Sequence, residues 1–192
     1  MKDDRRALHI QLETPPDTAR PFDDETWRRV ERAGAIDGLL SLVQAVSRIR
    51  ADGFELYGIN RRDLAIDPAT GRLYLVDAPR VKPIPPAETA HPESESIWRD
   101  ARLIGELAYE NFMGEDYPGG HQMAALLQER ESMARLGLLQ PGLTQVVAAC
   151  VSPYGELALL QMDDLARALE QLRREVTPRL NIYVGSGSTL GN

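Results

Sequence analysis

Residues 53–79 read GFELYGINRRDLAIDPATGRLYLVDAP. Two short apolar runs, Leu64 to Ile66 and Leu73 to Val76, flank the turn signal Asp67-Pro68-Ala69-Thr70-Gly71. Apolar runs of this length around a turn that contains proline and glycine predict a β-hairpin. Each run is followed at once by an aspartate. We therefore expect a hairpin with an acidic side chain in the loop after each strand.

Helical periodicity dominates on both sides of this hairpin. Gly34 and Gly38 interrupt the first pattern, so the first two helices are expected to be separate, and Gly53 is expected to cap the second. Residues 7–12 alternate enough to predict a strand. We predict helices from about Asp24, then at 36–51, 97–112, 121–139 (one or two helices), 143–151 and 159–176. The fold class is therefore mainly α with a small β-hairpin.

Length, net charge, apolar content and cysteine count exclude several classes of protein. At 192 residues the chain is expected to be one domain that buries about 70% of its unfolded surface. A formal net charge of −7 argues against a nucleic-acid partner, which would demand a basic surface. No apolar run approaches the length of a membrane span, so no membrane association is expected. A single cysteine, Cys150, excludes an internal disulfide and favours a cytoplasmic protein.

A longer frame extends from Gly53 to residue 79. It resembles the catalytic core of the eukaryotic-type protein kinases, whose consensus runs G-[IV]-x-H-R-D-L-K-x-x-N and ends, after a hairpin, in D-F-G. Aligned without a gap, Gly53 takes the opening glycine, Leu56-Tyr57-Gly58 the H-R-D position, and Asp63 the asparagine position. Asp77-Ala78-Pro79 takes the D-F-G position. The spacing of these positions matches the kinase consensus, whereas the residues at the catalytic positions differ from it.

A second motif lies further along the chain. Asp100 and Gly105 match the D-x-x-x-x-G pattern of the central helix of the kinase C-lobe, where the aspartate binds the backbone of the catalytic loop. The resemblance covers roughly residues 24–176 and implies a kinase C-lobe-like helical domain. Only about two dozen residues precede the first helix, too few for the strands of an N-lobe. Residues 1–23 would then be a strand and hinge-like segment.

The resemblance implies an inactive member of the family. The catalytic base position falls on Gly58, which has no side chain, and neither G-x-G-x-x-G nor V-A-I-K precedes Gly53. We therefore expect no enzymatic activity and no cofactor. The expected function is that of a pseudokinase, a protein-interaction or regulatory module with a protein partner. Partner docking is expected on the exposed face of the lobe where an N-lobe would rest. The proline-rich segment 79–95 is a second candidate for partner binding, and no oligomeric state is predicted.

Asp63 and Asp77 leave two interpretations open. Aspartates in loops commonly accept hydrogen bonds from nearby backbone N–H groups, which makes them capping residues. Carboxylate oxygens also suit magnesium, which such sites hold together with substrate phosphates. The alternative function is therefore a residual nucleotide and Mg²⁺ binder that uses Asp63 and Asp77 and is completed by another lobe or chain.

The final segment, 177–192, also permits two interpretations. A short β-like run, Leu180 to Val184, precedes Gly185-Ser186-Gly187, and a tail or linker explains this composition. The same residues resemble the opening strand of the metal-dependent Ser/Thr phosphatases. That resemblance implies a domain that controls a linked or partner phosphatase.

Overall fold

The structure, a computed structural model, describes residues 12–77, 81–84, 93–128, 141–151 and 161–177. Within these residues the chain is mainly helical, with two small antiparallel sheets. In chain order the elements are β1 (Arg20–Pro21), α1 (Asp24–Arg29), α2 (Arg32–Ala51), β2 (Phe54–Glu55), the 3-10 turn η1 (Arg61–Asp63), β3 (Leu64–Ile66), β4 (Leu73–Leu75), β5 (Lys82–Pro83), α3 (Glu93–Met113), α4 (Gly120–Gln128), α6 (Pro141–Val151) and α7 (Met162–Val176).

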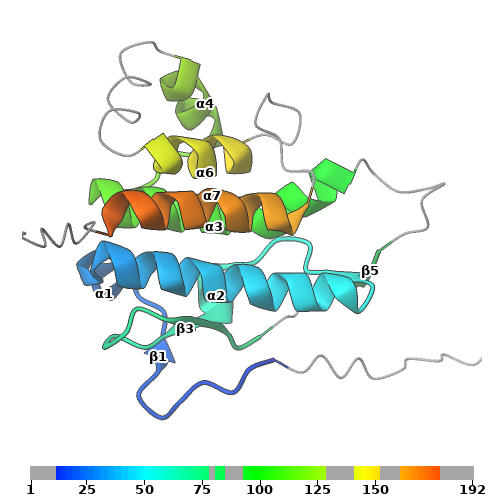
Figure 1. Ribbon diagram of the computed structural model, residues 1–192. Helices are drawn as coiled ribbons and strands as arrows, with labels where there is room; N and C mark the ends of the chain where they lie inside the picture. Colours follow the sequence, from blue (N-terminus) through cyan, green and yellow to red (C-terminus); the bar gives the residue numbers. More distant parts are fainter. Residues whose placement is uncertain (1–11, 78–80, 85–92, 129–140, 152–160, 178–192) are drawn as a thin grey trace, which may run out of the picture.

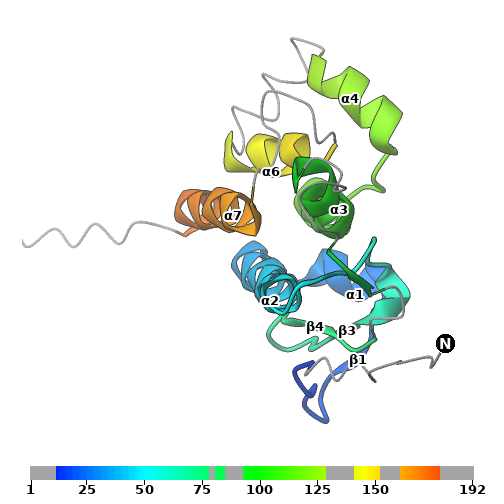
Figure 2. The ribbon, with the colours of Figure 1, turned by 90° about the vertical axis from the view of Figure 1, so that its right-hand side faces the viewer.

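Helix α2 is the central element. In Figures 1 and 2 it lies between the hairpin on one side and the helices α3 and α7 on the other, with α6 beyond these two. It contacts α7, α3 and β4 directly. An apolar side chain recurs on α2 at almost every helical turn and is buried against these neighbours. Its buried apolar residues are Ala35, Ile36, Leu39, Leu42, Val43, Val46 and Ile49.

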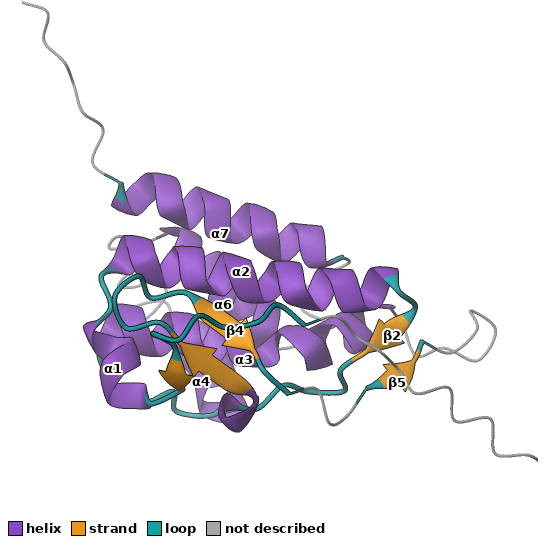
Figure 3. Cartoon of the chain, turned by 90° about the horizontal axis from the view of Figure 1, so that it is seen from below, coloured by secondary structure: helices purple, strands orange, loops and turns teal. Residues whose placement is uncertain are grey.

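The predicted hairpin is confirmed. Strands β3 and β4 pair antiparallel, with Leu64 opposite Leu75 and Ile66 opposite Leu73, and all three residues of each strand are buried. Strand β1 adds to the outer side of β3, which gives the order β1-β3-β4. The second sheet joins β2 to β5 at the far end of α2 (Figure 3). Pro83 lies in this two-strand edge pairing, where a missing N–H is tolerated.

The predicted separation of the first two helices is present, but the break lies at residues 30–31 and not at the glycines. The helix begins at Arg32 and runs without interruption through Gly34 and Gly38. Both glycines face the turn of the hairpin: a Cβ on Gly34 would lie 2.8 Å from the Thr70 carbonyl oxygen, and a Cβ on Gly38 would overlap the Gly71 carbonyl oxygen. The glycines therefore allow the close approach of helix and turn rather than ending the helix.

The other predicted helices are present with shifted ends. Helix α1 begins after Asp23, whose carboxylate accepts a hydrogen bond from the N–H of Thr26 at 2.8 Å. Helix α3 begins at Glu93, so the end of the proline-rich segment is helical. This is compatible with Pro92, because a proline just ahead of a helix removes no intrahelical hydrogen bond. Helices α6 and α7 begin at Pro141 and Met162.

Several predictions concern residues outside the described part of the chain. These are the strand at 7–12 apart from Leu12, positions 78–79 of the D-F-G frame, residues 129–139, the start of the last helix at 159–160, and the tail 178–192. None of the described helices combines the length and apolar character needed to cross a bilayer.

Candidate functional site

Two backbone hydrogen bonds hold Gly53, the residue at which the chain leaves α2. Gly53 has φ 86, and its N–H donates to the Arg50 carbonyl oxygen at 2.9 Å. A glycine in this left-handed conformation just after the last helical residues is the expected way to end a helix. The carbonyl oxygen of Gly53 accepts a hydrogen bond from the N–H of Ile84 at 2.9 Å. The chain therefore leaves α2 directly into the β2·β5 pair.

Asp100 binds the loop after β2. It lies on α3 with its side chain fully buried, and its Oδ1 accepts a hydrogen bond from the Leu56 N–H at 3.0 Å. Its Oδ2 accepts from Arg50 Nη1 at 2.9 Å. Burial raises the pKa of Asp100, and the hydrogen bond and positive charge of Arg50 oppose this shift. One carboxylate thus joins α2, the 56–58 loop and α3.

Two further polar residues complete a buried network around Asp100. Arg50 Nη1 also donates to Ser96 Oγ at 3.1 Å, and Ser96 Oγ donates to a carboxylate oxygen of Glu55. Glu55 and Ser96 are both buried. Sequence analysis missed this network, although Arg50 at the end of an apolar helix was a visible signal. It fixes the start of α3 relative to the end of α2.

Residue 58, where the kinase resemblance implies a catalytic base, is a glycine and has no side chain. Gly58 has φ 96, and Tyr57 before it has φ 54, so two consecutive residues adopt the left-handed conformation. Glycine does so without steric cost, whereas a side chain at residue 58 would be strained. The backbone here is therefore shaped for a turn in which residue 58 contributes no acid or base.

Asp63 caps the turn η1. Its side chain is buried, and its Oδ2 accepts hydrogen bonds from the Asn60 N–H at 2.8 Å and from Asn60 Nδ2 at 3.3 Å. Its carbonyl oxygen accepts from the N–H of Val76 at 2.9 Å, which ties the turn to the end of β4. The capping interpretation of Asp63 therefore describes contacts that are present.

The backbone of Asp77 lies next to that of Asp63, but the Asp77 side chain is exposed and the Asp63 side chain is buried. The Asp77 N–H approaches the Asp63 carbonyl oxygen at 3.4 Å. The described residues contain no group of three or more histidine, cysteine, aspartate or glutamate side chains placed to hold a metal ion. The two aspartates are thus neighbours, one engaged in a cap and one facing solvent.

A second ion pair, between the half-buried Arg61 and the buried Glu110, ties η1 to α3. Arg61 in η1 donates to both carboxylate oxygens of Glu110, with distances of 2.8 and 2.7 Å, and it also pairs with Asp24 at the start of α1. Glu110 is buried on α3 and accepts a further bond from the Tyr117 N–H at 3.1 Å. These bonds raise the pKa of Arg61. Sequence analysis missed this pair, and its signal was Glu110 three residues after Leu107 on the apolar face.

Gly105 lets α3 approach α6. A Cβ at this position would overlap Cys150 Cβ and lie 2.9 Å from its Sγ. Cys150 is itself buried, which raises the pKa of its thiol to about 12. The thiol therefore stays protonated at neutral pH, as expected for a packing residue rather than a nucleophile.

We expect Gly105→Ala to destabilise the fold by about 1 to 3 kcal/mol, because overpacking displaces α6 from α3. The measurement is urea unfolding followed by circular dichroism. Adding Cys150→Gly removes the atoms in the way, so the double variant should recover part of the loss, less about 1 kcal/mol for glycine within a helix. This packing account would be contradicted if the double variant were destabilised by as much as, or more than, the sum of the two single variants.

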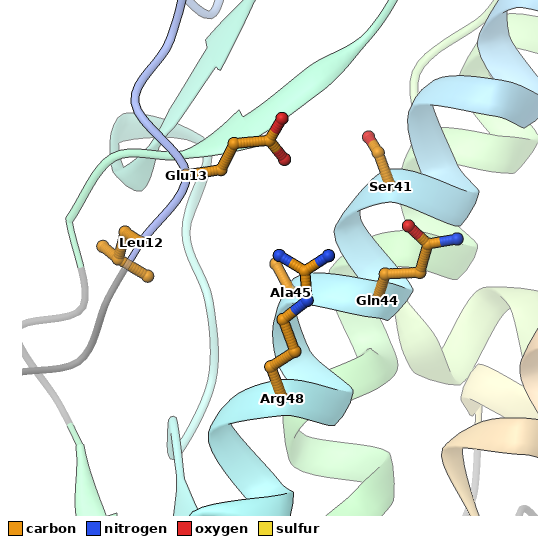
Figure 4. A pocket seen from close by; sticks show the side chains of 6 residues that line it. All are labelled: Leu12, Glu13, Ser41, Gln44, Ala45 and Arg48. Carbon is orange, nitrogen blue, oxygen red and sulfur yellow. The ribbon is translucent and has the colours of Figure 1, made fainter.

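A small pocket lies where the first described residues cross α2 (Figure 4). It is lined by Leu12, Glu13, Ser41, Gln44, Ala45 and Arg48. Glu13 reaches towards the helix and pairs with Arg72 of the hairpin at 2.8 Å, while Ser41 donates to the Gly38 and Leu73 carbonyl oxygens. Gln44 and Arg48 are exposed. The Glu13–Arg72 pair ties the N-terminal segment to the hairpin and the Ser41 bond to Leu73 ties α2 to β4, so these contacts are structural.

No protein-family model matches the chain. No curated protein sequence matches it. Inference of function therefore rests on the geometry of residues 53–63 and of the helices that hold them.

Proposed function

We propose that this chain is a catalytically inactive, kinase-like domain, reduced to the helical lobe, that works as a protein-interaction or regulatory module. The observation that carries the proposal is the hydrogen bond from the Leu56 N–H to the buried Asp100 carboxylate. This is the bond that the kinase resemblance implies between the central helix and the catalytic loop. It is retained next to Gly58, where the catalytic acid–base group would stand.

The order of elements supports the same proposal. A short helix, a long helix, the β2 segment, the turn η1 and the β3–β4 hairpin precede α3, and α3 packs against α2 and α6. The pairing of β2 with β5 brings the segment after the hairpin back to the loop before it. A structural framework of this kind keeps its packing whether or not the loop it supports performs chemistry.

The chemistry of the loop argues for a role without phosphoryl transfer. Kinases need a base near the hydroxyl and metal ligands near the phosphates. Gly58 has no side chain, and Asp63, at the position of a metal ligand, directs Oδ2 to Asn60 in the η1 cap. General-base assistance alone is worth about 10²- to 10⁴-fold in rate. The missing side chain at residue 58, together with the engagement of Asp63 in the cap, favours binding over catalysis.

Phosphoryl transfer is the direct test of inactivity. We expect no transfer from radiolabelled ATP, with Mg²⁺ or Mn²⁺, to the protein itself or to a generic acceptor protein above the rate of an Asp77→Ala variant. Asp77 is exposed, so this control should fold normally. Transfer that is clearly faster than the control and lost on Asp77→Ala would show an active enzyme and reject the proposal.

A thermal-shift titration with ATP and Mg²⁺ separates a silent module from a nucleotide binder. Ligand at 100 times its Kd stabilises a protein by about 2.7 kcal/mol, which is easily seen as a rise in melting temperature. We expect no rise. A rise that Asp77→Ala abolishes would instead favour the alternative in which Asp63 and Asp77 hold Mg²⁺ and another lobe or chain completes the site.

The proposed role requires a protein partner. The resemblance of residues 177–192 to the start of a metal-dependent Ser/Thr phosphatase makes such an enzyme, linked or separate, the first candidate for regulation in the cytoplasm. A phosphatase assay with and without this chain tests that assignment, and an unchanged rate would remove it while leaving the interaction module in place.

A further inference from the structure

One exposed aromatic side chain next to Gly58 is held between two cations. The ring of Tyr57 has Lys82 Nζ at 3.7 Å and Arg99 Cζ at 4.8 Å from its centroid. Lys82 comes from β5 and Arg99 from α3, so three segments distant in sequence meet here. We call Tyr57, Lys82 and Arg99, with Trp98 and Arg102 beside them on α3, the Tyr57 surface.

The backbone at Tyr57 is strained for its residue type. Among the described residues it is the one non-glycine position with a positive φ, at 54. For an L-residue this conformation is costly, and such costs concentrate at binding and switch sites. The side chain contacts Lys82 and Arg99, yet it remains 41% exposed. A costly backbone conformation that presents a partly exposed aromatic ring makes Tyr57 a candidate binding residue.

The ring borders a pocket. The pocket is lined by Tyr57, Gly58, Ile59, Asn60, Trp98, Arg99 and Arg102. Tyrosine, tryptophan and arginine are the residue types that dominate binding energy at protein interfaces, where they supply large contact areas and directed donors. Trp98 is already anchored through its indole N–H to the Cys150 carbonyl oxygen, so it forms a rigid wall rather than a mobile side chain.

The charge of this surface differs from that of the chain as a whole. Arg99 pairs with Glu95 at 2.7 Å and Arg102 with Glu106 at 3.2 Å, while Lys82 lies opposite the buried Glu55 across the β2·β5 pair. These charges balance to zero, on a chain whose formal net charge is −7, and Lys82 and Arg102 are the exposed cations among them. The pairing with Glu95 holds the Arg99 guanidinium in place while it leaves other N–H donors of the five for a ligand.

We propose that the Tyr57 surface docks an acidic peptide segment of the partner protein, with a carboxylate of that segment between Lys82 and the pocket next to Tyr57. This rests on the proposed function and names the chemistry of its partner. Charge complementarity supplies recognition, because the net negative protein repels an acidic chain in general, whereas this surface is locally neutral and offers the exposed cations Lys82 and Arg102. The ring and Trp98 supply apolar contact for the side chains on either side of the carboxylate.

A random 12-residue peptide display library, selected against the full chain, tests the proposal. We expect enrichment of peptides with net negative charge and an apolar or aromatic residue near a carboxylate. A synthetic fluorescein-labelled copy of the most enriched peptide then provides the binding probe, measured by fluorescence polarisation at two salt concentrations. Weaker binding at the higher salt is expected, because the surface charges are exposed.

Matched variants assign the binding to this surface. Lys82→Gln should weaken the peptide about tenfold, as expected for losing one charge-assisted contact. Arg174→Gln removes one positive charge, as Lys82→Gln does, but at an exposed side chain of α7, and it should leave binding unchanged. Tyr57→Gly should lower affinity at least as much as Lys82→Gln, yet leave the urea unfolding midpoint unchanged or higher, because glycine accepts φ 54.

The outcomes separate this inference from the proposed function. Enrichment of neutral or basic peptides, no enrichment, or equal binding to Lys82→Gln and the unchanged chain would overturn the acidic docking site. Displacement of the peptide by a few millimolar inorganic phosphate at constant ionic strength would overturn it too, in favour of a simple phosphate site. Measured phosphoryl transfer, in contrast, would reject the inactive module while leaving the docking result intact.

Discussion

Replacement of Asp100 by alanine should destabilise the protein by about 3 to 5 kcal/mol, the range found when one partner of a buried ion pair is removed. The variant leaves the guanidinium of Arg50, only 14% exposed, without its carboxylate. It also leaves the Leu56 N–H without its acceptor. Both losses act on the same junction, so the end of α2, the 56–58 loop and α3 should loosen together.

Urea unfolding monitored by circular dichroism and tryptophan fluorescence measures this effect. Asp100→Asn is the informative companion, because its amide oxygen can still accept from Leu56 but no longer carries the charge for Arg50. We expect Asp100→Asn to lose less free energy of unfolding than Asp100→Ala. The exposed Asp77→Ala is the control and should change stability by less than about 0.5 kcal/mol. An Asp100→Ala variant as stable as this control would contradict the junction described above.

Gly38→Ala should be as damaging, by about 3 kcal/mol, although alanine is the better helix former. The added Cβ would overlap the carbonyl oxygen of Gly71, which is backbone and has no rotamer to change. Gly71 cannot retreat easily, since its own φ is 76 and its N–H donates to the Asp67 carbonyl oxygen at 2.8 Å. The hairpin would have to move away from α2.

The matched control is Gly120→Ala at the start of α4, where a Cβ meets nothing within 4 Å. This substitution should be neutral or slightly stabilising, since it replaces a glycine at the start of a helix without any overlap. Equilibrium unfolding of both variants gives the comparison. Similar stability changes in the two would mean that the helix and the turn are not in close contact at Gly38.

Helices and strands were predictable from the sequence where their own apolar residues follow a regular spacing. The hairpin follows from two apolar runs around a turn, and α7 follows from its strongly one-sided distribution of Leu165, Leu169 and Leu172, all buried. The continuity of α2 was not predictable from Gly34 and Gly38 alone. Their role depends on the hairpin turn, which lies more than thirty residues later and whose distance from the helix no local pattern reveals.

The candidate site was predictable in part. The sequence left capping and metal binding open for Asp63, and the hydrogen bonds to Asn60 give the first interpretation a physical basis. The networks around Arg50 and Arg61 were missed, because each joins residues about fifty positions apart. The left-handed backbone at Tyr57 was missed for another reason, since tyrosine gives no sign of a positive φ.

The contact between α2 and α7 has a consequence for synthesis of the chain. The first long helix is covered on one side by the last, which begins at residue 162. A nascent chain that has emerged from the ribosome only as far as α6 therefore leaves apolar side chains of α2 in water. The contact between α2 and α7 can form only after residues 162–176 have been released, so this part of the core closes late in synthesis.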